Sequence, residues 1–233
     1  MGAAATITRA VHRVARREPL IGTGSLPGQE DPAFRHLVGD AAWKQLPDPV
    51  RRRFSRRLAP DCVVLYQGQV IETRLNRAGR VLAWLGRLIG APLPLGHGVT
   101  GPAAVAVAAD AINGGQTWTR IYARSGRFPQ VIQSAKRFHG PTGLEEHIGY
   151  GVSMALIVTV EAGALVFRSA GYAVTLAGRR LALPRWLEPG SMEIRHEQQG
   201  DGAFRFVLRL THAVLGEMLH QVAVFRDVRE HAA

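Results

Sequence analysis

The second half of the chain is dominated by an alternation of apolar residues with polar or small ones. The alternation begins near residue 102 and continues almost to the end of the sequence. A period of two predicts β-strands, each with one buried face. The segments 102–111 and 116–123 flank the sequence Ile-Asn-Gly-Gly, which is typical of a hairpin turn. Because no helical segments alternate with these strands, we expect an antiparallel sheet.

The clearest strand pattern lies between residues 145 and 161. Every second residue from Ile148 to Val160 is bulky, whereas the residues between them are mostly small. We interpret this segment as one continuous strand with a bulky face and a small face. Further strands are predicted over residues 62–73, which form either a hairpin or one bent strand, and over residues 128–138, 165–176, 178–184, 191–198, 203–211 and 216–228.

Helical patterns precede the strands. Residues 32–58 are predicted to form short helices, because Asp-Pro pairs at 31–32 and 48–49 each place a capping residue before a proline. Residues 75–91 have the strongest helical pattern. Their large apolar side chains share one arc of the helical wheel, which consists of Val81, Leu82, Leu85, Leu88 and Ile89. We expect this arc to pack on the sheet; the alternative is a basic amphipathic helix on a membrane surface.

Together these patterns predict an α+β fold. A long curved antiparallel β-sheet, barrel-like and of about eight strands, packs against one main amphipathic helix, with short N-terminal helices. Residues 1–31 are rich in Gly, Pro and polar residues and are expected to form a flexible tail, which leaves residues 32–233 as a single α+β domain. A curved sheet with a helix against it commonly encloses an apolar pocket.

The charge of the chain is strongly positive. The formal net charge is +11, and the first 90 residues carry 15 Lys and Arg against 7 Asp and Glu. Only Lys44 and Lys136 are lysines, a skew that a GC-rich genome would also produce. No zinc-finger, helix-turn-helix or RNA-recognition pattern accompanies the arginines, so we expect no nucleic-acid partner.

The sequence gives several indications of location. The N-terminal residues carry charges throughout and lack the apolar core of a secretion signal. The longest stretch without charged side chains, residues 88–109, contains three prolines, which argue against a transmembrane helix. The single cysteine, Cys62, cannot form an internal disulfide. We expect a cytoplasmic protein; the alternative of a peripheral location at the inner membrane rests on the Arg-rich front.

Several segments match a known family pattern. They are residues 37–54, 79–94, 114–122, 144–156, 161–174 and 202–219. Over residues 33–226 the chain resembles the bacterial family named domain of unknown function 4166, although Tyr122 stands where that family more often has Phe. The resemblance implies no established activity. Members often follow an NAD(P)-binding Rossmann domain or lie beside membrane segments. Since no GxGxxG follows a strand here, an NAD(P)-binding partner would be a separate protein.

The segment 114–122 contains the best candidate for a binding site. On a strand, Trp118, Arg120 and Tyr122 point to the same side, and an arginine between two aromatics can make cation–π contacts. If this side is buried, Arg120 needs an acceptor, and Glu146 is the best candidate because it is in phase with the bulky face of its strand. The predicted ligand-binding residues are Trp118, Arg120, Tyr122, Glu146, Tyr150 and Arg168.

No catalytic residue, metal site or cofactor is predicted. The histidines show no His-x-His or His-x-x-x-His spacing, and strand alternation places Glu146 and His147 on opposite faces. The serines lack a Gly-x-Ser-x-Gly elbow, and Cys62 begins an apolar strand. The spacing of the glutamates does not define an acid–base pair.

Three hypotheses for the function follow. The first is a non-catalytic module that binds an apolar or amphipathic small molecule, such as a lipid, between sheet and helix, with Arg120 fixing a polar end. The second is an enzyme, or an accessory subunit of an NAD(P)-dependent oxidoreductase, acting on a similar molecule. The third is a scaffold whose Arg-rich front, around Arg51, Arg52, Arg53, Arg56 and Arg57, holds a membrane surface or a partner protein.

Overall fold

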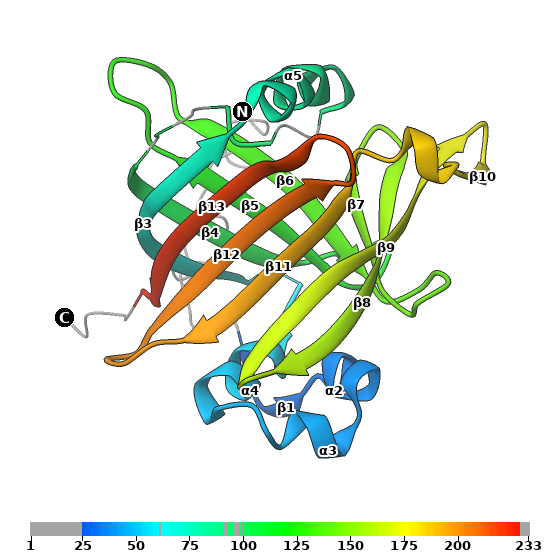
Figure 1. The fold of residues 1–233 in the computed structure, drawn as a ribbon. Coiled ribbons are helices and arrows are strands. Elements are labelled where there is room, and N and C mark those ends of the chain that lie inside the picture. The colour runs from blue at the N-terminus through cyan, green and yellow to red at the C-terminus, as the bar shows by residue number, and fades with distance from the viewer. Residues whose placement is uncertain (1–24, 61, 91–92, 96–97, 99, 229–233) are drawn as a thin grey trace, which may run out of the picture.

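The main structural element is a closed ring of antiparallel strands (Figure 1). The computed structural model describes residues 25–60, 62–90, 93–95, 98 and 100–228. Among these residues, ten strands form a barrel in the order β9-β11-β12-β13-β3-β4-β5-β6-β7-β8, and β8 pairs with β9 to close it. The ring strands are β3 (Val63–Leu75), β4 (Gly101–Ala109), β5 (Gln116–Tyr122), β6 (Gln130–Arg137), β7 (Glu145–Gly149), β8 (Val152–Glu161), β9 (Ala164–Leu176), β11 (Ser191–Gln198), β12 (Ala203–His212) and β13 (Gly216–Asp227).

The barrel-like antiparallel sheet agrees with the predicted architecture, but the expected count of about eight strands is too low. An additional strand, β10 (Arg179–Ala182), forms a hairpin with β9 outside the ring. The segment 145–161 is also two strands rather than one, because the chain turns at Tyr150, whose φ is +44°. Gly149 and Gly151 flank this turn and have positive φ angles. This Gly-x-Gly pattern is the turn signal that the regular alternation concealed.

Residues 62–73 were predicted to form either a hairpin or one bent strand, and the structure shows one strand, β3. It is one long strand that pairs with β4 on one side and β13 on the other. Opposite β13 the register shifts between Glu72 and Val70, so that Ile71 is an extra residue in the ladder. Such a bulge bends a strand and increases its twist, which helps a sheet to close.

The N-terminal helices cover one end of the barrel, at the bottom of Figure 1. They are α2 (Ala33–Val38), α3 (Asp40–Trp43) and α4 (Asp48–Phe54). Their aromatic residues reach the barrel core: the ring of Phe34 lies 5.2 Å from that of Phe54 and 5.9 Å from that of Phe167. The predicted capping is not observed as expected: Asp31 accepts a hydrogen bond from the Ala33 amide, but Pro32 is the N-cap of α2 and Asp48 lies inside α4.

The predicted N-terminal tail falls only in part on described residues. Residues 25–30 form a strand, β1 (Ser25–Glu30), which pairs with β2 (Arg56–Leu58) beside the helices. Residues 1–24 lie outside the described part of the chain. The N-terminal helices and this small two-stranded sheet thus form one cap on the barrel.

The main helix covers the opposite end, but its packing differs from the prediction. It consists of α5 (Arg77–Gly86), followed by the 3₁₀ turn η1 (Arg87–Ile89). Its buried residues are the small Gly79 and Ala83, whereas Val81, Trp84 and Leu88 are mostly exposed. The expected apolar arc therefore points largely away from the sheet. The reason is close approach: a Cβ on Gly79 would lie 1.9 Å from the carbonyl oxygen of Met218 in β13, so the helix docks through its small side chains.

Candidate functional site

The barrel encloses a cavity of about 320 Å³ beneath α5. Small-molecule sites usually have volumes of about 300–1,000 Å³. Apolar side chains from both the helix cap and the strands make up most of its wall, including Leu82, Ile89, Leu93, Ile132, Ile148, Val152, Met154, Val174, Leu183, Leu187, Met192, Ile194, Phe206, Leu208 and Leu210. Because strand alternation brings these residues inward from β6 to β12, the cavity is a property of the barrel rather than of one loop.

Charged and polar side chains gather on one side of this cavity, on the adjacent strands β5, β6 and β7. Arg120 donates a hydrogen bond to the Ser134 hydroxyl over 3.1 Å, and Ser134 donates to a Glu146 carboxylate oxygen over 2.6 Å. The Arg120 guanidinium lies 3.6 Å from the same oxygen, and Lys136 Nζ lies 3.1 Å from the other one. All four side chains are buried. The result is an ion-pair network inside the barrel in which two cations share one carboxylate.

The ionisation of this network follows from its geometry. Burial alone would raise the pKa of Glu146, but the charges of Lys136 and Arg120 and the hydrogen bond from Ser134 outweigh it and lower this pKa to about 2. Burial also lowers the pKa of Lys136, an effect that Glu146 partly offsets. Glu146 is therefore a carboxylate at neutral pH, and it is the shared partner of the Arg120 and Lys136 side chains.

A second void, of about 20 Å³, lies on the other side of Arg120, towards the N-terminal cap. Arg53 of α4 projects into it, with its guanidinium 3.7 Å from the centre of the Phe204 ring. Its Nε and Nη1 atoms have no hydrogen-bond partner among the described residues. His196 lines the same void, and burial, reinforced by the charges of Arg53, Lys136 and Arg120, lowers the pKa of His196 well below its ordinary value. His196 is thus neutral and adds no further positive charge.

Four of the six predicted site residues come together inside the barrel: Trp118, Arg120, Tyr122 and Glu146. The predicted ion pair between Arg120 and Glu146 is confirmed, and the Arg120 guanidinium lies 5.8 Å from the Trp118 ring centre. Tyr122 lines the main cavity and donates a hydrogen bond to Gln221 over 3.3 Å. Trp118 lines the smaller void but not the main cavity. Ligand binding by these residues stays a prediction.

The other two predicted residues lie away from the cavity. Tyr150 is 81% exposed at the β7–β8 turn, where its ring lies against Gly90 at the end of η1. Arg168 is on the outer face of β9, where Glu161 and Glu193 hold its guanidinium in ion pairs. Tyr150 misses the interior because of the turn described above. Arg168 misses it because its place in the alternation of β9 is that of the outer face.

The sequence did not lead us to predict two members of the network, which are Ser134 and Lys136. Both follow from the same period-two argument, because they lie on β6 at positions that pair with Trp118 and Glu146 respectively. Lys136 is also one of only two lysines in an arginine-rich chain. The predicted basic front also needs correction, since Arg53 is buried and points into the barrel instead of joining a surface patch.

Fold and site together define a class: an antiparallel barrel, capped at both ends, with an apolar cavity and a buried cationic wall. Residues 46–225 match the family described as domain of unknown function (DUF4166), and the chain belongs to that family. Comparison with curated proteins gives no match. The family assignment agrees with the resemblance in the sequence and carries no activity with it.

Proposed function

We propose that this protein is a non-catalytic binding module for an amphipathic molecule with an apolar body and an anionic end, such as a fatty acid or a related lipid. The observation that carries the proposal is the cavity of about 320 Å³, whose lining is mostly apolar and has one polar side with Arg120, Ser134 and Glu146. Burying an apolar chain there removes about 25 cal/mol of unfavourable hydration for each Å² of its surface. The apolar wall supplies affinity, and Arg120 supplies orientation.

The charge of the network favours an anionic end group. Arg120 and Glu146 both line the cavity, and Lys136 lies behind them on the same carboxylate. With one carboxylate between two cations, an incoming carboxylate or phosphate oxygen would balance the remaining positive charge. A charge-assisted bond to a planar guanidinium is well suited to either group.

The ionisation of Glu146 favours binding over catalysis. A general acid or base works best when its pKa lies near the operating pH, whereas the pKa of Glu146 is about 2. Glu146 is instead suited to fix the positions of Arg120 and Lys136. A role beside a separate NAD(P)-binding protein stays a prediction that rests on the family resemblance.

The first test measures binding of palmitate and of its neutral methyl ester to the purified full chain. We expect palmitate to bind about 10- to 100-fold more tightly than the ester, because a hydrogen bond to a charged group contributes roughly 1.5–3 kcal/mol. The Arg120→Gln variant should lose this preference while still binding the ester. Native mass spectrometry after mild lipid extraction provides an independent readout. Equal affinity of the wild-type protein for acid and ester would overturn the anion assignment, and no binding of either would overturn the proposal.

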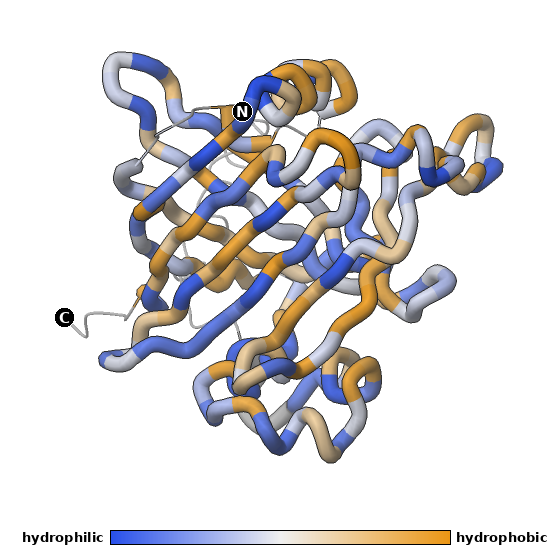
Figure 2. The backbone as a smooth tube through the Cα atoms, in the orientation of Figure 1, coloured by the Kyte–Doolittle hydropathy of each residue, from blue (hydrophilic) through white to orange (hydrophobic). Residues whose placement is uncertain are grey.

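The surface around the cavity supports a second element of the proposal, loading from an anionic membrane. Figure 2 shows apolar segments at the α5 end of the barrel, on α5 itself, on the β12–β13 turn and near β10. The exposed large apolar side chains there are Val81, Trp84, Leu85, Leu88, Tyr150, Leu176, Leu181, Trp186, Leu187, Val214 and Leu215. The segment 77–90 contains three arginines and no acidic residue. This combination of apolar and cationic side chains fits a surface of anionic lipid.

Membrane docking is tested with vesicles of phosphatidylcholine, with and without anionic phosphatidylglycerol. None of the helices in the described part of the chain has the length and apolar content of a membrane span. We expect binding to the anionic vesicles only, weakened by salt, and reduced about tenfold or more in a Trp84→Ala/Leu88→Ala variant. Ile112→Ala is the control, since Ile112 is 94% exposed in the β4–β5 hairpin, beside the start of β3 rather than the end that leads into α5. An equal loss in the control would contradict docking through α5.

A further inference from the structure

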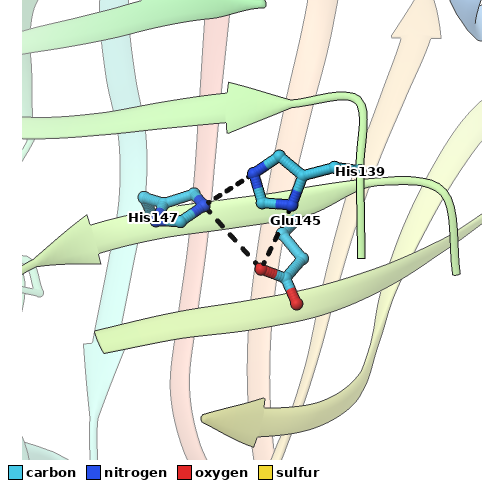
Figure 3. Close-up of side chains that lie close together, drawn as sticks. All are labelled: His139, Glu145 and His147. Carbon is cyan, nitrogen blue, oxygen red and sulfur yellow. Dashed lines mark hydrogen bonds and ion pairs between the residues drawn. The ribbon is translucent and has the colours of Figure 1, made fainter. Parts of the chain in front are cut away.

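Three side chains with metal-binding chemistry meet on the outside of the barrel, away from the cavity. They are His139, in the loop after β6, and Glu145 and His147, on β7 (Figure 3). Glu145 and Glu146 are consecutive on a strand, so they point to opposite faces of the barrel wall. His147 and Glu146 lie on opposite faces of β7, which is why the sequence pattern predicts no metal site there. The carboxylate on the same face as His147 is that of Glu145, and the loop 138–144 brings His139 to it.

The distances among these side chains suit a common ion. The Nε2 atoms of His139 and His147 lie 3.3 Å apart. One Glu145 carboxylate oxygen lies 3.7 Å from His147 Nε2 and 3.7 Å from His139 Nδ1. Zn²⁺ bound tetrahedrally at about 2.0–2.2 Å requires its ligand atoms to be roughly 3.4 Å apart. The two distances from His139 belong to different nitrogens of its ring, so this half-exposed ring has to turn to direct one nitrogen at an ion shared with Glu145 and His147.

The surroundings of the cluster position its ligands. Glu145 is only 1% exposed, and its other carboxylate oxygen is held by Arg180 of β10, which leaves one oxygen facing the histidines. On the far side of His147, Nδ1 lies 3.5 Å from the Arg137 guanidinium, at the outer limit of a hydrogen bond. Arg137 is itself held by Asp110 over 3.0 Å. When Nε2 binds a metal, Nδ1 carries the proton and no longer accepts from Arg137, which retains Asp110 as its partner.

We propose that His139, Glu145 and His147 form a binding site for a divalent metal ion of the zinc class. Two imidazoles and one carboxylate are a ligand set that suits Zn²⁺, and three protein ligands leave a fourth position for water. The exposed side of His139 faces solvent, so that this fourth position is accessible. The site joins the 138–144 loop to β7 and is independent of the proposed ligand in the cavity.

The test is calorimetric titration of the full chain, without a histidine tag, with Zn²⁺. We expect one ion per chain for the wild-type protein. The variants His139→Ala and His147→Gln should each weaken binding by about 100-fold or more, because even partners outside the coordination sphere are worth 10- to 100-fold in affinity. His36→Ala is the matched control, since His36 is an exposed histidine on α2.

A second measurement uses Co²⁺ as a spectroscopic probe. Binding at the site should give the visible absorption of a four-coordinate ion in the wild-type protein and in His36→Ala, and this absorption should be absent in His139→Ala. Because His139 lies in a loop and is half-exposed, its replacement should leave the fold intact, which circular dichroism checks. Absence of stoichiometric Zn²⁺ binding, or unchanged affinity in both ligand variants, would overturn the proposal.

Discussion

Replacing Glu146 with Gln is expected to destabilise the barrel by about 3–5 kcal/mol, the usual cost of removing one partner from a buried ion pair. The loss is large because Lys136 and Arg120 then remain buried without their shared carboxylate. Urea unfolding followed by circular dichroism measures the free-energy difference. A double variant, Lys136→Met/Glu146→Gln, should recover part of the loss, since it removes one of the unpaired cations.

The same residue predicts a dependence of stability on pH. The pKa of Glu146 is about 2 in the folded protein against an ordinary value of 4.5, so its ion pairs stabilise the fold fully above pH 4.5. This contribution, roughly 3 kcal/mol, is lost as the pH falls from 4.5 through 2. The free energy of unfolding of Glu146→Gln should therefore fall less steeply than that of the wild-type protein over this range.

The matched control for Glu146 is Glu161, on the outer face. The hydrogen bond from Arg168 is the largest influence on Glu161 and also lowers its pKa to about 2, but its side chain is 38% exposed. Solvent screens that interaction, so Glu161→Gln should cost less than about 1 kcal/mol. Equal effects of Glu146→Gln and Glu161→Gln would show that the interior network contributes nothing beyond an ordinary surface ion pair.

Filling the cavity should abolish ligand binding without unfolding the protein. In Ile132→Trp the indole would occupy the space in which the apolar body is proposed to lie, and we expect palmitate affinity to fall by about 100-fold. Some overpacking strain, on the order of 1–3 kcal/mol, is expected in the unfolding free energy. Fluorescence displacement of a bound fatty-acid analogue measures the affinity.

The control for this prediction is the neighbouring position on the same strand. Val131 is 46% exposed on the outside of β6, so Val131→Trp introduces the same side chain without entering the cavity. Its affinity for palmitate should equal that of the wild-type protein. If Ile132→Trp binds palmitate as tightly as Val131→Trp does, the ligand lies elsewhere and the cavity is not the site.

Local periodicity accounts for what the sequence could predict about the fold. Alternation identified almost every strand and the hairpin at 112–115, because one face of each strand is buried against a shared core. Closure of the ring was less accessible, since the pairing of β3 with β13 depends on contacts between residues distant in sequence. The predicted packing of α5 was wrong for a physical reason. The pattern showed an apolar arc, but Gly79 lets the helix approach β13 more closely than large side chains would allow.

The residues of the candidate site were likewise predictable only where strand periodicity places them. In-phase positions on neighbouring strands predicted the pair of Arg120 and Glu146, because both point inward. Lys136 also points inward by this rule, but it was not among the predicted site residues. The group of His139, Glu145 and His147 could not be found from spacing, since a loop brings His139 back beside β7. The cavity itself depends on how the barrel and its caps leave space, which no local pattern encodes.

The pairing of β3 with β13 has a consequence for the order of folding during synthesis. These strands are the first and last of the ring, and the Gln221–Thr73 side-chain hydrogen bond between them joins residues 148 positions apart. A nascent chain cannot complete this ladder until its final strand has left the ribosome. Until then the edges of β3 and β12 that pair with β13 have no partner strand, and the ring assembles with the slow kinetics expected of high contact order.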